Sequence, residues 1–148
     1  MSQRSAYQRI LVGFDGSENG MRALARGIAL AKQSKGELRI VVVADVMTAA
    51  AYASATGFYQ RFNDQAKENA ENLASEALEI AKREGVANAY SSDEEGQPAD
   101  MILTLAREYK SDLIIVGRRG IRGLTRFFMG SVSTGVINQA KCDVLIVK

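Results

Sequence analysis

The stretch GRRGIRGLTRFFMGSVS, from residue 117 to residue 133, concentrates the residue types that bind anions. Its glycines allow a ligand to approach the backbone closely, and its arginines can pair with phosphate. Free N–H groups at the start of a helix favour an anion by about 0.3–1 kcal/mol. Each feature alone also occurs in ordinary turns and caps, but together they predict a phosphate-binding loop. The backbone of Gly130, Ser131, Val132 and Ser133 and the hydroxyls of both serines would supply its donors, and Arg118 and Arg119 would close over the phosphates.

The elements that must position this loop follow from the hydrophobic pattern. Apolar runs bounded by turn residues predict buried strands, and segments with apolar residues every three or four positions predict helices. Strands are expected at residues 9–15, 37–46, 112–116 and 142–148, with a weaker, largely polar one at 86–92 before an acidic turn at 93–97. Helices are expected at residues 17–35, 59–84, 98–109 and 130–140. The buried face of the first helix should consist of Met21, Leu24, Ala25, Ile28 and Ala31.

Alternating strands and helices predict an α/β fold. We expect a single domain over residues 1–148, with an open, parallel, five-stranded sheet of order 3-2-1-4-5 and helices on both faces. Ligands of such sheets bind beyond the carboxyl ends of the strands, where the strand order reverses. The loops FDGS and GRRG would therefore face one crevice between the first and fourth strands. Residues 47–58 are expected to form a loop or loose helix over the sheet edge, or a mobile lid.

Composition excludes several classes of function. The 148 residues include no histidine, so a Ser-His-Asp triad and a histidine-ligated zinc site are impossible. The single cysteine, Cys142, cannot form an intrachain disulfide and is expected to be an inert core thiol. A formal charge of +2 argues against a protein that mainly coats nucleic acid. The polar N-terminus and the absence of a long apolar run predict a cytoplasmic protein without membrane attachment.

The spacing Gly117-x2-Gly120-x9-Gly130-Ser131 resembles the nucleotide-binding signature of the ATP-binding subgroup of the universal stress protein family. The resemblance covers nearly the whole chain, through RILVGFDGSENGMRAL, VVVAD, GQPADMILTLAREYKSDLIIVGRRG and CDVLIVK, in that order. It implies a Rossmann-like, adenine nucleotide alpha hydrolase-like fold that binds ATP. Three positions depart from the family pattern: Gly13 stands where many members have proline, Phe14 replaces a smaller residue, and Arg118 replaces a small polar one.

The resemblance also assigns residues to the ligand. It implies that Gly13, Phe14 and Asp15 lie by the nucleotide, that Val43 contacts adenine, and that Val116 and Gly117 border the adenosine. It implies that the ribose and phosphates are held by Arg119, Gly120, Gly130, Ser131, Val132 and Ser133. A carboxylate next to a polyphosphate calls for a cation, so Asp15 is a candidate ligand of Mg²⁺ or Mn²⁺. Two other roles for Asp15 are a hydrogen bond to the adenine or ribose and capping of the first helix.

The leading functional hypothesis is an ATP-binding stress-response or regulatory protein that acts on an unknown protein partner. Hydrolysis should be slow at most, because the chain has no GxxxxGK[ST] motif and no histidine base. The resemblance implies a homodimer that pairs through the C-terminal edge strand. Alternatives are a dimeric interaction module that binds no nucleotide, an FMN carrier of flavodoxin type, and a weak nucleic-acid binder. The last would use the patch of Arg118, Arg119, Arg122 and Arg126, although Phe127 and Phe128 are expected to pack rather than stack on bases.

Overall fold

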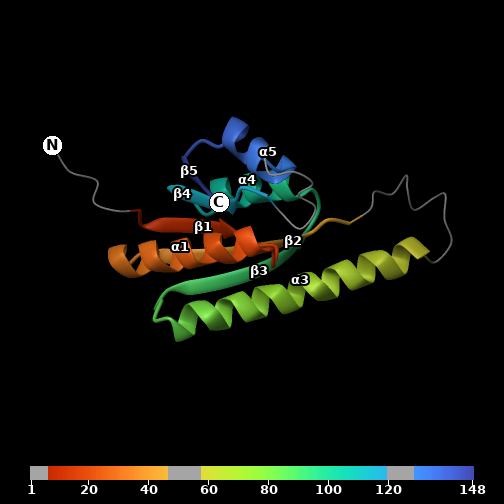
Figure 1. The fold of residues 1–148 in the computed structure, drawn as a ribbon, viewed down its shortest axis with the longest axis horizontal. Coiled ribbons are helices and arrows are strands. Elements are labelled where there is room, and N and C mark those ends of the chain that lie inside the picture. Colours follow the sequence, from red (N-terminus) through yellow and green to blue (C-terminus); the bar gives the residue numbers. More distant parts are fainter. Residues whose placement is uncertain (1–6, 47–57, 120–128) are drawn as a thin grey trace.

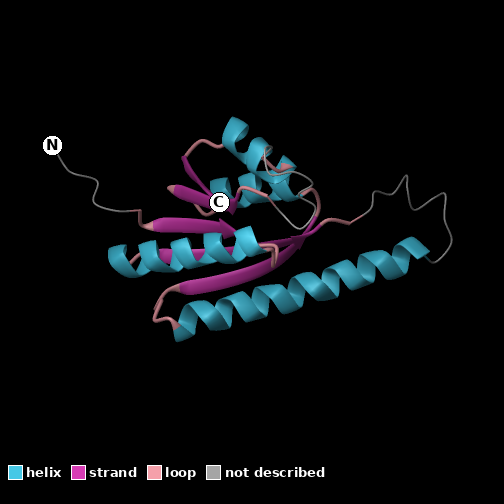
Figure 2. Cartoon of the chain, in the orientation of Figure 1, coloured by secondary structure: helices cyan, strands magenta, loops and turns pink. Residues whose placement is uncertain are grey.

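A parallel sheet of five strands, in the order β3-β2-β1-β4-β5, forms the centre of the molecule (Figures 1 and 2). The computed structural model describes residues 7–46, 58–119 and 129–148. The strands are β1 (Arg9–Gly13), β2 (Glu37–Ala44), β3 (Ala89–Glu95), β4 (Leu113–Gly117) and β5 (Asp143–Val147). The helices are α1 (Glu18–Ser34), α3 (Phe58–Arg83), α4 (Pro98–Glu108) and α5 (Ser131–Gln139). The predicted fold class and strand order are confirmed.

Helices cover both faces of the sheet. The side chains of β1 alternate between the two layers: Ile10 and Val12 lie in the core beneath α1 and α3, and Leu11 lies in the core beneath α4 and α5. All three are at most 1% exposed, as expected of a parallel strand that is covered twice. The longest helix, α3, runs along β2 and β3, and its first turns extend past the strand ends (Figure 1). None of the helices in the described ranges is long and apolar enough to cross a membrane.

The third strand lies three residues later than predicted. It begins at Ala89 and includes Asp93, Glu94 and Glu95, which the sequence pattern placed in a turn. Its parallel register with β2 runs from Leu38 opposite Ala89 to Ala44 opposite Glu95. Charged residues are tolerated there because β3 is an edge strand, and charges on an edge also oppose pairing with other chains. An ion pair of 3.2 Å between Lys67 and Glu95 links α3 to this strand.

The buried face of α1 also differs from the prediction. Met21 is 42% exposed and Ala25 is exposed, whereas Ala23 and Gly27 are buried. The helix therefore contacts the sheet through small residues, which let its backbone approach closely. A Cβ atom added at Gly27 would lie 2.5 Å from Val12 Cγ2 and 3.2 Å from Leu38 Cδ1. Packing thus requires glycine at this position, whereas the apolar spacing of the helix would equally accept a larger residue.

We expect Gly27→Ala to destabilise the fold, although the same change in an exposed helix stabilises by about 0.5–1 kcal/mol. The added methyl group would overlap Val12 in the core, and such overpacking costs about 1–3 kcal/mol. The free energy of unfolding from urea denaturation checks this, with Gln33→Ala on the exposed side of α1 as the control. An unfolding free energy equal to or above that of the parent protein would show that α1 does not approach the sheet this closely.

Candidate functional site

A cavity of about 490 Å³ opens at the carboxyl ends of β1, β2 and β4. Its walls come from α3, α4 and the N-terminus of α5. This is the place where the strand order reverses, as expected for a ligand site in a parallel sheet. Every predicted site residue within the described ranges lines it: Gly13, Phe14, Asp15, Val43, Val116, Gly117, Arg119, Gly130, Ser131, Val132 and Ser133. Gly120 lies outside the described residues.

The residues that follow β1 are held by hydrogen bonds to β2 and to the start of α1. The N–H of Phe14 donates to the carbonyl of Val41 at 2.9 Å, and the Phe14 side chain is 4% exposed within the core on the α1 and α3 side. One oxygen of Asp15, Oδ1, accepts from the N–H of Ser17 at 3.0 Å and from its hydroxyl at 2.6 Å. The Ser17 hydroxyl oxygen in turn accepts from the N–H of Gly20 at 3.0 Å and so caps α1. Ser17 is therefore the N-cap of α1, and Asp15 orients Ser17 and does not cap the helix itself.

Gly117 lines the cavity, but glycine is required at this position because helix α1 packs directly behind it. A Cβ atom at Gly117 would lie 2.8 Å from Asn19 Cβ and 2.9 Å from the Asn19 carbonyl carbon. From the sequence, this glycine was expected to serve the approach of a ligand. The structure shows instead that it lets the first turn of α1 lie against the end of β4. Gly117 thus brings the exits of β1 and β4 together.

The start of α5 supplies backbone donors to the cavity. Gly130 is the N-cap, and among the described residues no side chain caps this helix. The N–H groups of Ser131, Val132 and Ser133 belong to its first turn and have no helical acceptor. Contrary to expectation, the N–H of Gly130 is already used, since it donates to the carbonyl of Arg118 at 2.8 Å.

The hydroxyl of Ser133 was also predicted to contact phosphate, and its surroundings give it another role. Ser133 is 1% exposed, and its hydroxyl lies 2.9 Å from the carbonyl oxygen of Arg118 and 3.0 Å from that of Gly130. Both are acceptors, so the hydroxyl proton is directed at the backbone. Ser133 therefore fastens α5 to the loop after β4, and of its polar groups only the backbone N–H remains for a ligand.

Charged residues of both signs line the cavity. Arg118 and Arg119 come from the loop after β4, and Asp15 and Asp45 follow β1 and β2. No group of three or more potential metal-ligating His, Cys, Asp or Glu side chains occurs within the described part of the chain. Any cation would therefore need oxygens of the ligand or water in addition to Asp15. Cys142 lies outside this cavity, at the start of β5, where burial raises the pKa of its thiol.

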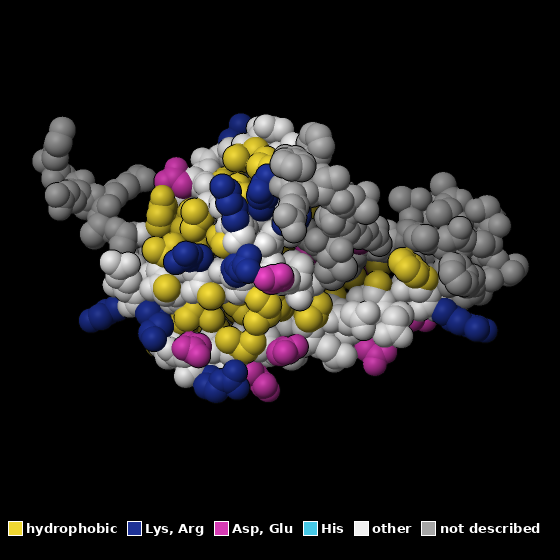
Figure 3. Space-filling model, in the orientation of Figure 1, with side chains coloured by type: hydrophobic (Ala, Val, Ile, Leu, Met, Phe, Trp, Pro, Cys, Tyr) yellow, Lys and Arg dark blue, Asp and Glu magenta, His cyan; other side chains and the backbone are white. Residues whose placement is uncertain are grey.

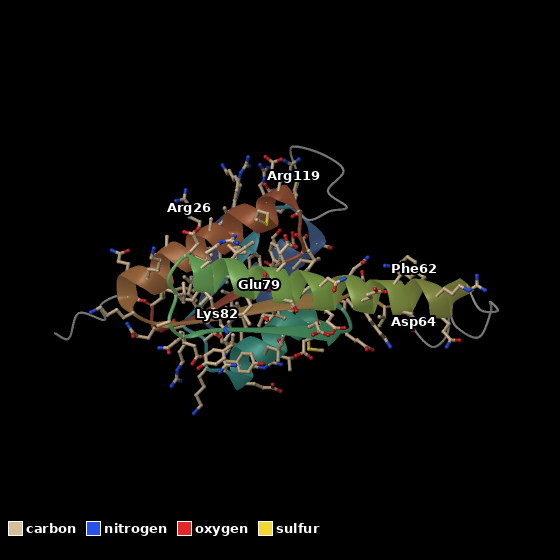
Figure 4. The ribbon with its side chains drawn as sticks, turned by 90° about the horizontal axis from the view of Figure 1, so that it is seen from below. Arg26, Phe62, Asp64, Glu79, Lys82 and Arg119 are labelled. Carbon is tan, nitrogen blue, oxygen red and sulfur yellow. The ribbon has the colours of Figure 1, made fainter. Side chains whose placement is uncertain are left out.

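The sequence missed the wall that α3 contributes. The sequence pattern predicted only a helix over residues 59–84, yet several of its residues line the cavity: Phe62, Ala66, Asn69, Ala70 and Leu73. Figure 4 shows Phe62 near the beginning of α3, on the part that extends past the strands. The helical spacing was the available signal, but it cannot separate a core contact from a cavity wall. Gln97, Pro98 and Ile102 of the α4 region were also missed.

The comparison with protein families identifies the family to which the chain belongs. The model of the universal stress protein family matches residues 6–148. A Staphylococcus aureus (strain USA300) protein named for this family is 36% identical over 143 residues, covering 96% of this chain and 84% of the relative. The chain belongs to the universal stress protein family.

Two solved structures define the similarity further. Universal stress protein UspA from Lactobacillus plantarum superposes with a TM-score of 0.84 at 21% identity, covering 98% of this chain and all of that one. A universal stress protein crystallised in complex with cAMP has a TM-score of 0.69 at 32% identity, covering 97% of this chain and 98% of that one. The first supports the fold, and the second shows that a relative binds a nucleotide.

A double-mutant cycle tests the link between Asp15 and the cap of α1. We expect Ser17→Ala to cost about 1 kcal/mol of unfolding free energy, the usual loss for an N-cap. Because Asp15 acts through Ser17, Asp15→Ala in the Ser17→Ala background should cost less than it does in the parent protein, by about 0.5 kcal/mol or more. Urea denaturation of the four proteins measures this coupling. Additive losses would mean that Asp15 does not orient the cap.

Proposed function

We propose that this protein binds ATP, together with Mg²⁺ or Mn²⁺, in the cavity between β1 and β4. The observation that carries the proposal is the convergence of α5 donors and two arginines on a cavity of about 490 Å³. Fixed backbone N–H groups and guanidinium groups are the donors that phosphate prefers. The apolar side chains of β2 and Ile102 offer the surface that an adenine ring would need. A relative that was crystallised in complex with cAMP supports a nucleotide as the class of ligand.

We further propose that the nucleotide regulates binding to a protein partner during stress. The chain has no histidine base and no GxxxxGK[ST] motif, so two common parts of phosphoryl-transfer enzymes are absent from the sequence. Bound ATP would then persist for longer than the turnover times of kinases. A long-lived nucleotide suits a protein whose output is the binding of a partner.

Calorimetric titration of nucleotide-stripped protein with ATP and Mg²⁺ tests the proposal. We expect micromolar affinity, and a loss of at least tenfold (about 1.4 kcal/mol) in Gly130→Val, whose side chain would enter the phosphate end. Gly130 has φ −66° and ψ 162°, an extended conformation that valine adopts readily, so the variant should fold. Thr134→Val in the same helix is the control, because Thr134 is exposed and does not line the cavity.

The same titrations in a chelator examine the metal. If Asp15 holds a cation against the phosphates, Asp15→Ala should weaken ATP in Mg²⁺ and change little in the chelator. Equal affinity of parent and variant in both buffers would leave Asp15 with only the role of orienting Ser17. Absence of ATP binding by the parent protein would refute the nucleotide proposal and favour the interaction module.

We also propose that two copies pair through β5. The two edges of the sheet differ: β3 carries Asp93, Glu94 and Glu95, whereas β5 reads DVLIV, with Val144, Leu145 and Ile146 only half-buried. Ile137 of α5 is 47% exposed and belongs to the helix that packs on β4 and β5. A bare apolar edge strand favours aggregation, so a two-fold contact between copies would protect it.

Sedimentation velocity at micromolar concentration checks the assembly. We expect the mass of a dimer for the parent protein and of a monomer for Ile137→Lys combined with Val144→Lys, which would place charges on the α5 side of β5. Tyr90→Ser is the matched control, because Tyr90 is 48% exposed on the opposite edge strand. A monomeric parent protein would exclude the proposed pairing.

A further inference from the structure

The position of Arg118 points to a role that the backbone donors of α5 do not have. We propose that Arg118 is the specificity-determining residue that makes the site prefer a nucleoside triphosphate over a monophosphate. This inference rests on the proposed binding of an adenine nucleotide in the same cavity. The site would distinguish nucleotides by the length and charge of their phosphate chain.

The backbone of Arg118 is fixed on both sides. Its N–H donates to the carbonyl of Val147 at the end of β5, with 2.7 Å between N and O. Its carbonyl accepts from the N–H of Gly130 at 2.8 Å and from the hydroxyl of Ser133 at 2.9 Å. Arg118 is therefore attached to the first turn of α5, and its guanidinium is carried from a fixed point beside the donors of that helix.

The charges of the described residues leave Arg118 available. The ion pairs among these residues are Arg22–Glu18, Arg39–Glu37 and Lys67–Glu95, and none includes Arg118. Arg118 lines the cavity and is half-buried, so a phosphate that contacts it would be partly shielded from solvent. A partly buried charge pair is less screened than a surface pair, and its contribution grows with the charge of the ligand.

The two kinds of donor respond differently to the ligand. The N–H groups of Ser131, Val132 and Ser133 belong to one helical turn and can surround one phosphate group, whichever nucleotide carries it. The guanidinium of Arg118 would add two parallel hydrogen bonds and a full charge, and in this proposal it contacts the other phosphate groups of the nucleotide. Figure 4 shows that the neighbouring Arg119 lies near the N-terminal end of α1, on the same side of the molecule as Arg26. Figure 3 shows further Lys and Arg side chains over α1 and near the C-terminus.

Titration with ATP, ADP and AMP, each with Mg²⁺, measures the preference directly. We expect the parent protein to bind ATP about tenfold or more tightly than AMP, as one charge-assisted interaction would produce. In Arg118→Gln this ratio should fall about tenfold, while the affinity for AMP changes by less than about twofold. Arg118→Lys keeps the charge without the fork, so its ratio should lie between the two. Arg26→Gln is the control, because Arg26 is exposed on α1 and does not line the cavity.

Two results would overturn the inference while leaving nucleotide binding intact. In one, Arg118→Gln weakens ATP, ADP and AMP by the same factor, which would indicate a structural role. In the other, the ratio of affinities is unchanged in both variants at Arg118. If the parent protein binds none of the three nucleotides, the proposed function fails and this inference fails with it. Circular dichroism melting of each variant shows that the fold is retained, and Arg118→Lys supplies the test if Arg118→Gln does not fold.

Discussion

Gly13, the last residue of the central strand, pairs with Val41 on one side and with Val116 on the other, and β2 continues beyond it to Ala44. Parallel strands are joined by helical crossovers, so all five strands run in one direction and their carboxyl ends lie at one end of the sheet. The exits of β1, β2 and β4 therefore lie at the same end of the sheet. The cavity and its charged lining follow from this register.

Small residues then set the distances between the layers. Gly27 allows α1 to lie on Val12, and Gly117 allows the first turn of the same helix to lie on the end of β4. Gly13 has a similar function on the other face, because a Cβ atom there would lie 2.7 Å from Ile102 Cδ1 of α4. These glycines affect the shape of the cavity because they allow α1 and α4 to pack closely against the sheet. Their effect on a ligand is therefore indirect.

The sequence was sufficient for the order and class of the elements, since β1, β2 and β4 are continuous apolar runs that only a doubly covered sheet accommodates. The sequence was insufficient to place residues whose side-chain type does not indicate whether they are buried. The predicted bounds of the polar β3 were too early because an edge strand needs no apolar pattern. Met21 was assigned to the core, although it is exposed and Gly27 belongs to the buried face of α1. At the site, spacing predicted which residues line the cavity, but the hydrogen bonds of Ser133 and Gly130 depend on tertiary contacts that no local pattern contains.

The hydrogen bonds around Arg118 connect β5, the strand proposed to pair two copies, with the start of α5, which is proposed to bind the nucleotide. Val147, at the end of β5, accepts from Arg118, and Arg118 accepts from Gly130 and Ser133 at the start of α5. Arg118 therefore offers one path by which a shift of β5 would reach the α5 donors. Conversely, a ligand that holds Arg118 and α5 would favour one position of the last strand. Binding at two sites becomes linked when both bias the same element, and the link acts equally in both directions. If copies pair through β5 as proposed, nucleotide binding and assembly would share this element.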